Sequence, residues 1–179
     1  DTAHVTEMPG MFASCDKLTS VTFSEKFDTS SVEKMYDLFR YCSSLETLEL
    51  PEAFDTSNAT EIQNMFDGCK SLKSLELPEN FDAASAIHME RMFCDCLSLT
   101  SLELPDGFRT SNAEYMHQLF QGCSKLTSLK LPETFDTSKV TNMYAMFNNC
   151  TALTELNLPE SFNTTNVKKW IRCLREILH

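Results

Sequence analysis

The chain has 179 residues, 42% of them hydrophobic and 23% charged, with a net charge of −11 at pH 7. These proportions are those of a folded protein with a core, and no apolar run approaches the roughly 20 residues of a membrane span. The excess of acidic residues argues against binding to a nucleic-acid backbone. No signal peptide is visible at the start of the sequence.

The sequence repeats itself every 27 residues without a gap. A period of this size is typical of a solenoid, propeller or array, and repeat proteins usually offer a recognition surface. The shared template is D-T-S-x-V-x-x-M-x-x-M-F-x-x-C-x-x-L-x-x-L-x-L-P-x-x-F, and we number its positions 1 to 27. Repeats start at Asp1, Asp28, Asp55, Asp82, Arg109 and Asp136, and a partial repeat starts at Asn163.

The first half of each repeat carries apolar residues at positions 5, 8, 11, 12 and 15. In the sixth repeat these are Val140, Met143, Met146, Phe147 and Cys150. Spacings of three and four residues place them on one face of a helix. Ser138 precedes them at a position suited to a helix N-cap. The pattern predicts a helix of about three turns in every repeat.

The second half reads L-x-x-L-x-L-P, as in Leu72, Leu75 and Leu77 before Pro78. Leucines two apart face the same side of a strand, and proline ends the strand because it lacks an amide donor. We therefore predict an α/β leucine-rich repeat solenoid with one short parallel strand and one short helix per coil. Helices are wider than the strand spacing, so the stack should curve with its sheet on the concave side.

Residues 1–179 are expected to form a single domain of about six coils, closed by a C-terminal capping helix over residues 163–179. The apolar stripe of that helix is Val167, Trp170, Ile171, Leu174, Ile177 and Leu178. A helix lying on a membrane surface is the alternative interpretation. We also expect further repeats or another domain before Asp1, because the first coil would otherwise expose an apolar edge.

Two ladders of phenylalanine should form the core, one at position 12 and one at position 27. The first is Phe12, Phe39, Phe66, Phe93, Phe120 and Phe147, and the second is Phe27, Phe54, Phe81, Phe108, Phe135 and Phe162. Each ring should bury roughly 150–250 Å². Their regular placement indicates a structural role.

Six of the eight cysteines recur at position 15, namely Cys15, Cys42, Cys69, Cys96, Cys123 and Cys150. Three interpretations compete: a ladder of small buried thiols, disulfides between neighbouring coils, and a metal site. The buried ladder is favoured, since no Cys or His pair has zinc spacing and parallel side chains suit disulfides poorly. Cys94 falls on the outer face of the predicted helix, where it would be a reactive surface thiol, and Cys173 also lies outside the ladder.

The run F-x-x-C-x-x-L-x-x-L-x-L-P followed by F-D-T-S-x-V-x-x-M resembles the BspA-like leucine-rich repeat surface proteins. Residues 65–78 and 135–159 carry this resemblance best, and it extends to about Val167. The resemblance implies a secreted or cell-surface protein, in most cases bacterial, with a role in adhesion. It brings no catalytic residues with it.

The residues themselves do not indicate an enzyme. The four histidines are scattered, and no phosphate-binding loop, dinucleotide-binding glycine pattern or HExxH motif is present. No calcium-binding loop is recognisable either. We therefore expect no catalytic residues, no cofactor and no metal.

Two surfaces are candidates for binding a partner. The outer face of the predicted helices varies between repeats and contains residue types that interfaces favour, although an exposed face that simply drifts in sequence is the plainer explanation. Its candidates are Tyr36, Arg40, Tyr41, Arg91, Tyr115 and Tyr144. The exposed face of the strands carries Glu49, Glu76, Glu103 and Lys130 at position 22. Like charges stacked at strand spacing are mildly destabilising, so a basic partner or a cation would relieve them.

The sequence thus predicts a non-enzymatic module that binds a protein or a glycan at a bacterial cell surface or outside the cell. Nucleic acid and stable membrane insertion are not expected. The alternatives are a structural spacer and an intracellular, cytoplasmic interaction scaffold.

Overall fold

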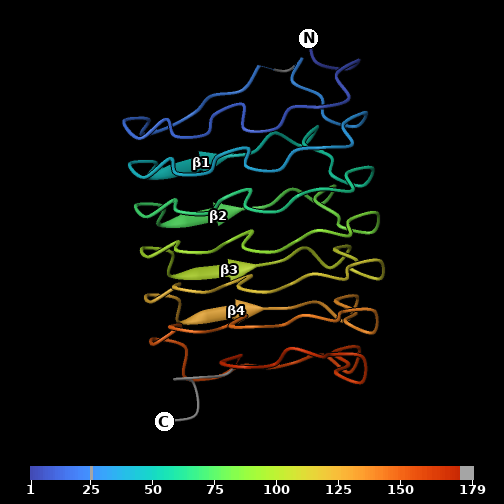
Figure 1. The fold of residues 1–179 in the computed structure, drawn as a ribbon. Coiled ribbons are helices and arrows are strands. Elements are labelled where there is room, and N and C mark those ends of the chain that lie inside the picture. Colours follow the sequence, from blue (N-terminus) through green and yellow to red (C-terminus); the bar gives the residue numbers. More distant parts are fainter. Residues whose placement is uncertain (25, 174–179) are drawn as a thin grey trace.

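The structure is a computed structural model that describes residues 1–24 and 26–173. The chain winds into coils that stack into a column, with the N-terminus at one end and the C-terminal part at the other (Figure 1). Each repeat forms one coil, because residues 27 apart in the sequence lie side by side in neighbouring coils. Among the described residues, no helix is long and apolar enough to cross a membrane.

The strands are short and parallel, as predicted, but they occur in the second to fifth coils only, and the described residues of the first and sixth coils form none. They are β1 (Thr47–Glu49), β2 (Ser74–Glu76), β3 (Ser101–Glu103) and β4 (Ser128–Lys130). Parallel pairing joins β1 to β2 and β3 to β4, in a register that places Leu48 beside Leu75 and Leu102 beside Leu129. In each strand the central leucine is buried and its two neighbours are exposed. One face of the strands therefore packs on the core and the other meets solvent. Figure 1 shows the four strands one above another in successive coils.

The predicted helix in each coil is absent from the described residues, whose regular elements are the four strands. The first half of each coil is instead a series of turns whose amides bond to the next coil. Met35, Asp37 and Phe39 donate their amides to the carbonyls of Glu61, Gln63 and Met65 at 2.8–3.0 Å. Parallel bridges at position 7 run through the whole stack, from Glu7 to Lys169. These amides are thus already satisfied and are not available for bonds along a helix.

Left-handed backbone at two positions per coil explains why residues 1–24 and 26–173 form no helix. The φ angles at position 10 and position 14 are positive in coil after coil, between 54° and 78°. Such angles interrupt an α-helix, and glycine adopts them at no steric cost. Gly10, Gly68 and Gly122 occupy these positions, as do Asp37, Asn64 and Asp95. The apolar spacing of three and four is retained, but a turning coil supplies it.

Two further expectations change with the helices. The predicted curvature rested on helices wider than strands, and that difference is gone because coil-to-coil hydrogen bonds set the spacing on both sides. Figure 1 shows a nearly straight column. At the end of the chain, residues 163–173 form turns and one bridge, between Asn142 and Lys169. The remainder of the predicted capping helix, residues 174–179, lies outside the described residues.

The core is filled by the two phenylalanine ladders. Successive rings at position 12 stack almost parallel, with centroids 5.7 Å apart and an interplanar angle of 3° for Phe39 and Phe66. Rings at position 27 stack at similar distances, 6.1 Å for Phe54 and Phe81. These four rings are fully buried. The repeat of large apolar side chains, rather than any local element, holds the coils in register.

Candidate binding surface

The exposed sheet face carries a ladder of glutamates. Glu49 and Glu76 are register partners in β1 and β2, and Glu103 is the register partner of Lys130 in β4. All four side chains are exposed. Adjacent strands lie about 4.8 Å apart, so like charges meet directly at this position and repel. The strand-face candidates predicted from the sequence are thus brought together on one surface.

A second acidic ladder follows the strands and was missed by the sequence analysis. Position 25 is acidic in all six complete repeats, and in the last five it immediately follows the proline that ends the strand segment. The signal was visible in the sequence as an acidic residue after every template proline from the second repeat onward. All five residues are exposed, and they are Glu52, Glu79, Asp106, Glu133 and Glu160.

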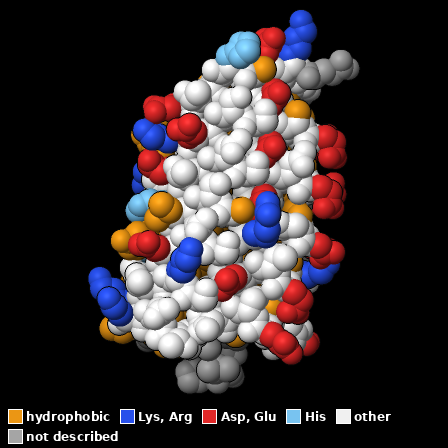
Figure 2. Space-filling view, turned by 90° about the vertical axis from the view of Figure 1, so that its right-hand side faces the viewer, with side chains coloured by type: hydrophobic (Ala, Val, Ile, Leu, Met, Phe, Trp, Pro, Cys, Tyr) orange, Lys and Arg blue, Asp and Glu red, His pale blue; other side chains and the backbone are white. Residues whose placement is uncertain are grey.

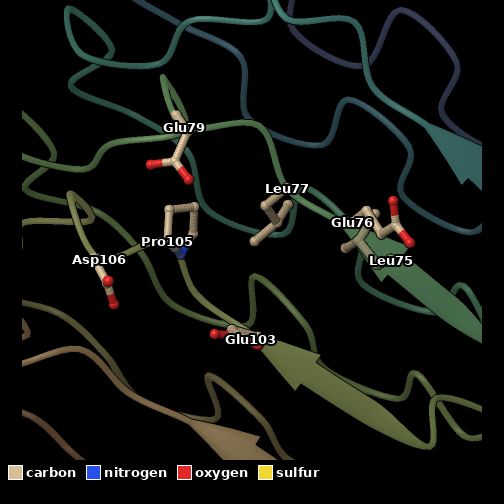
Figure 3. Close-up of a pocket in the computed structure, with 7 residues that line it drawn as sticks. All are labelled: Leu75, Glu76, Leu77, Glu79, Glu103, Pro105 and Asp106. Carbon is tan, nitrogen blue, oxygen red and sulfur yellow. The ribbon is translucent and has the colours of Figure 1, made fainter.

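A hollow lies between these two ladders at the ends of β2 and β3. Its volume is about 260 Å³, and its lining is Leu75, Glu76, Leu77, Glu79, Glu103, Pro105 and Asp106. Figure 3 shows Leu77 and Pro105 between the carboxylates of Glu79 and Glu76. The hollow therefore combines an apolar floor with an acidic rim.

Lys130 shows how a cation binds on this face. Its Nζ donates a hydrogen bond to Glu103 Oε1 and lies 3.6 Å from Asp106 Oδ1. The hydrogen bond to Glu103 is the main cause that raises the pKa of Lys130, with the negative charge of Asp106 adding to it. Among the described residues, Glu49, Glu52, Glu76 and Glu79 take part in no ion pair.

The side of the column toward which the strands point carries few charged side chains over much of its area. Figure 2 faces this side, and most of it is backbone and uncharged polar side chains. Acidic side chains gather along the right-hand edge of the view, over successive coils. Other acidic side chains lie on the left and in the centre of the view, among Lys and Arg side chains.

The turns in the first half of each coil, positions 1 to 15, form a surface that we call the turn side. There the structure brings three of the predicted candidates together around a buried acid. The side chain of Asp67 is 0% exposed and accepts hydrogen bonds from Arg40 Nε at 3.3 Å and from the terminal nitrogen of Arg91 at 3.1 Å. Tyr41 lies under the Arg40 guanidinium, 4.6 Å from it, and its ring packs against Gly68. Arg40, Tyr41 and Arg91 are thus engaged within the fold.

The other turn-side candidates are dispersed. The Tyr115 ring stacks on His88 at 4.8 Å, and it takes part in the position-7 bridges. Tyr36 and Tyr144 are half-buried in the second and sixth coils, far from each other along the column. These three tyrosines do not form one patch.

The cysteines form the buried ladder that the sequence favoured. All eight are free thiols, seven are buried, and Cys15 is exposed. The expectation of a reactive surface thiol at Cys94 is wrong, because its coil turns inward where a helix would have faced out and leaves the side chain 0% exposed. Burial raises the pKa of this thiol well above its usual range. Cys173 is buried as well, and burial raises its pKa to about 12.

One group of side chains has its polar atoms as close together as the ligands of a metal ion. Ligand atoms of Asp67, Cys94 and Asp95 lie within 4.8 Å of one another. The Asp67 carboxylate is already neutralised by two guanidinium groups, and the Cys94 thiol is protonated at neutral pH because burial raises its pKa. This group is best described as part of the Asp67 ion-pair network.

The family model described as "Mycoplasma protein of unknown function, DUF285" matches residues 1–104 and 88–176. The chain belongs to this family. DUF285 is a repeat family, and the two overlapping matches agree with the 27-residue repeat and with the BspA-like leucine-rich repeats that the sequence resembles. No curated protein sequence matches the chain.

Solved structures confirm that this DUF285 chain has a leucine-rich repeat fold. A T. pallidum leucine-rich repeat protein is 27% identical over 87% of the chain, with a TM-score of 0.61. One from Bacteroides ovatus is 22% identical over 87%, with a TM-score of 0.57. One from Eubacterium ventriosum is 21% identical over 80%, with a TM-score of 0.51. The chain spans 64%, 35% and 40% of these three proteins.

Repeat proteins of this kind work as interaction modules. The matched family and structures are repeat proteins. The leucine-rich repeat fold of the DUF285 chain is thus one that suggests an interaction module.

Proposed function

We propose that the chain is a non-enzymatic recognition module that binds a protein or glycan partner through the exposed face of β1–β4. The observation that carries the proposal is the register pairing of Glu49 with Glu76, two exposed carboxylates without an ion pair among the described residues. Stacked like charges cost stability. A fold that keeps them is explained when a partner of complementary charge binds there.

The turn side supports this choice by contrast. Its charged candidates, Arg40 and Arg91, neutralise the buried Asp67 and so have a structural task. The strand-face glutamates of the first two strands, Glu49 and Glu76, take part in no ion pair among the described residues, whereas Glu103 in β3 pairs with Lys130. Binding energy is therefore more readily available on the strand face than on the turn side.

We further propose that the module acts outside the cell or at the cell surface, with the cytoplasm as the alternative. This follows from the resemblance to BspA-like surface proteins. The structures it matches belong to longer proteins, of which the chain spans 64% or less. The role of the module in its whole protein, in adhesion or otherwise, is part of the proposal.

The test is a pull-down with the immobilised, reduced chain from matrix, host-cell and bacterial lysate fractions. One variant changes Glu49, Glu76 and Glu103 to glutamine. A matched control changes the exposed residues Asp16, Glu33 and Glu114 to their amides, so that the net charge changes equally. We expect saturable binding that the strand-face variant loses and the control keeps.

The other outcomes select between functions. Binding kept by the strand-face variant would move the partner site to the turn side. Absence of saturable binding to any fraction would favour the structural spacer. Thermal unfolding of the three proteins should agree within a few degrees, because all of the changed side chains are exposed.

A further inference from the structure

The contacts of Lys130 reveal more about the partner than the negative charge alone. Lys130 occupies position 22 in the fifth coil, and its ammonium lies between Glu103 and Asp106 of the fourth coil. Those two acids occupy positions 22 and 25. One lysine side chain therefore spans the two acidic ladders across a coil boundary.

The same pair of acids recurs one coil earlier without a lysine. Glu76 and Glu79 occupy positions 22 and 25 of the third coil, and the residue equivalent to Lys130 is Glu103. Neither Glu76 nor Glu79 has an ion-pair partner among the described residues. The hollow of about 260 Å³ lies here, lined by both of them. We call this hollow the Glu76–Glu79 seat.

The lining of the seat suits a lysine side chain in particular. Leu75, Leu77 and Pro105 form an apolar floor, and the carboxylates stand at its rim (Figure 3). A lysine buries its aliphatic stem on apolar surface while its ammonium stays near charge and water. Arginine prefers a planar, bidentate contact with a single carboxylate. The lining contains no aromatic side chain against which a sugar ring could stack.

We propose that the Glu76–Glu79 seat receives a lysine side chain from a partner protein, in the way that the Glu103–Asp106 pair receives Lys130. This inference rests on the proposed function and names the class of partner: a protein segment with an exposed lysine. Glu49 and Glu52 occupy the same two positions one coil earlier. A segment with more than one lysine can therefore engage successive coils.

The sharpest test fills the seat from within the chain. Glu103→Lys places a lysine in the fourth coil at the position equivalent to Lys130, from which it reaches Glu76 and Glu79. Asp106, which lies 3.6 Å from the Lys130 ammonium in the wild type, is unchanged in this variant and still offers Lys130 a partner. The control Glu114→Lys makes the same change of charge at an exposed residue on the turn side. Glu76→Gln/Glu79→Gln is a second variant that removes the seat without adding a side chain.

The probe is an octalysine peptide. Its binding to the protein at low salt is measured from the changes in the protein's amide chemical shifts and by calorimetry. We expect saturable shifts concentrated at residues 75–79 and 103–106. Glu103→Lys and Glu76→Gln/Glu79→Gln should each weaken binding at least tenfold, and Glu114→Lys less than threefold. Octalysine acetylated on every Nζ should not bind, and octaarginine should bind more weakly than octalysine.

The proposal is overturned if the shifts spread evenly over all acidic residues, or if Glu114→Lys weakens binding as much as Glu103→Lys. Equal binding of the acetylated peptide would overturn it too. Failure of the seat is distinguishable from failure of the proposed function. Suppose that a partner from the pull-down does not bind the triple glutamine variant but binds the wild type and Glu103→Lys equally. The strand face would then still be the binding surface, and the proposal that the seat receives a lysine would be wrong.

Discussion

The Cys69 thiol donates a hydrogen bond to the carbonyl oxygen of Phe39 in the preceding coil, at 3.2 Å. That oxygen also accepts the amide of Cys42 at 3.1 Å, so the thiol uses its second lone pair. The same contact recurs at every buried cysteine of the ladder: Cys42 with Phe12, Cys96 with Phe66, Cys123 with Phe93 and Cys150 with Phe120. Cysteine recurs at position 15 because it is small, apolar and still able to donate to this carbonyl.

Buried thiols make the fold sensitive to alkaline pH. Burial raises the pKa of Cys150 to about 12 and that of Cys69 further, from an ordinary value of 9.0. Below pH 9 each thiol is neutral in both states, so its contribution to stability is fully present. Above pH 9 the unfolded thiols lose protons that the folded ones keep, and stability falls by about 1 kcal/mol per thiol between pH 9 and 10.

Urea unfolding in a phosphine reductant at pH 8, 9 and 10 measures this loss. The variant Cys69→Ala/Cys150→Ala should be less stable at pH 8 but lose about 2 kcal/mol less between pH 9 and 10 than the wild type. Lysine and tyrosine titrations are common to both proteins and cancel in the comparison. Identical pH slopes for the two proteins would contradict the ladder of neutral buried thiols.

Thiol labelling tests the placement of each cysteine. Cys15 is exposed, whereas Cys94 and the rest are buried with raised pKa values in the described residues. The thiolate is the reactive form. We expect iodoacetamide at pH 8 to modify Cys15 alone in the native protein, and all eight cysteines after unfolding. Peptide mass spectrometry identifies the modified cysteines. Rapid modification of Cys94 in the native protein would show that it is a surface thiol after all.

Replacing Asp67 by asparagine should destabilise the turn side. Asp67 is fully buried, and the change leaves the half-buried guanidinium groups of Arg40 and Arg91 without their common counter-charge. We expect a loss of about 1–3 kcal/mol in the free energy of unfolding. Asp16→Asn, at an exposed position, should change it by less than about 0.5 kcal/mol. An equal effect of the two changes would show that the network carries no stability.

The sequence predicted the elements whose side chains recur strictly and missed those that depend on the backbone. Both phenylalanine ladders are present where their periodicity placed them, and the L-x-L-P strand is present in the second to fifth coils but not in the sixth. The predicted helix is not present in the described residues, because apolar spacings of three and four residues fit a helix and a turning coil equally. Gly10, Gly68 and Gly122 carried the distinguishing signal, since three of the four glycines fall at positions 10 and 14.

The candidate surface was predicted in part for a related reason. Glu49, Glu76 and Glu103 were found because strand alternation places position 22 outward. The second ladder, with Glu79 and Asp106, lies after the proline, where no periodicity says which way a side chain faces. Arg40 and Arg91 were predicted as surface candidates because the sequence does not show that both pair with Asp67. Asp67 lies one coil away from each arginine and 24–27 residues away along the chain.

The left-handed turn at Gly68 gives the most direct test of the coil against the helix. Its φ is +76°, and a Cβ at this residue would lie 2.4 Å from Tyr41 Cδ1. Gly68→Ala should therefore cost about 1–2 kcal/mol for the backbone and more for the displaced ring. In a helix the same change would stabilise by up to about 1 kcal/mol, so the sign of the effect distinguishes the two structures.

Gly107→Ala is the matched control, because the backbone there is not left-handed and the nearest atom to a new Cβ is 3.9 Å away. It should be neutral or stabilise by up to about 1 kcal/mol. Adding Tyr41→Ala to Gly68→Ala should remove the clash and leave the backbone cost, so the two changes should be coupled when measured as a double-mutant cycle. Thermal and urea unfolding of Gly68→Ala, Tyr41→Ala, the double variant and Gly107→Ala measure these differences. If Gly68→Ala stabilises the protein, the predicted helix is correct and the left-handed turn is wrong.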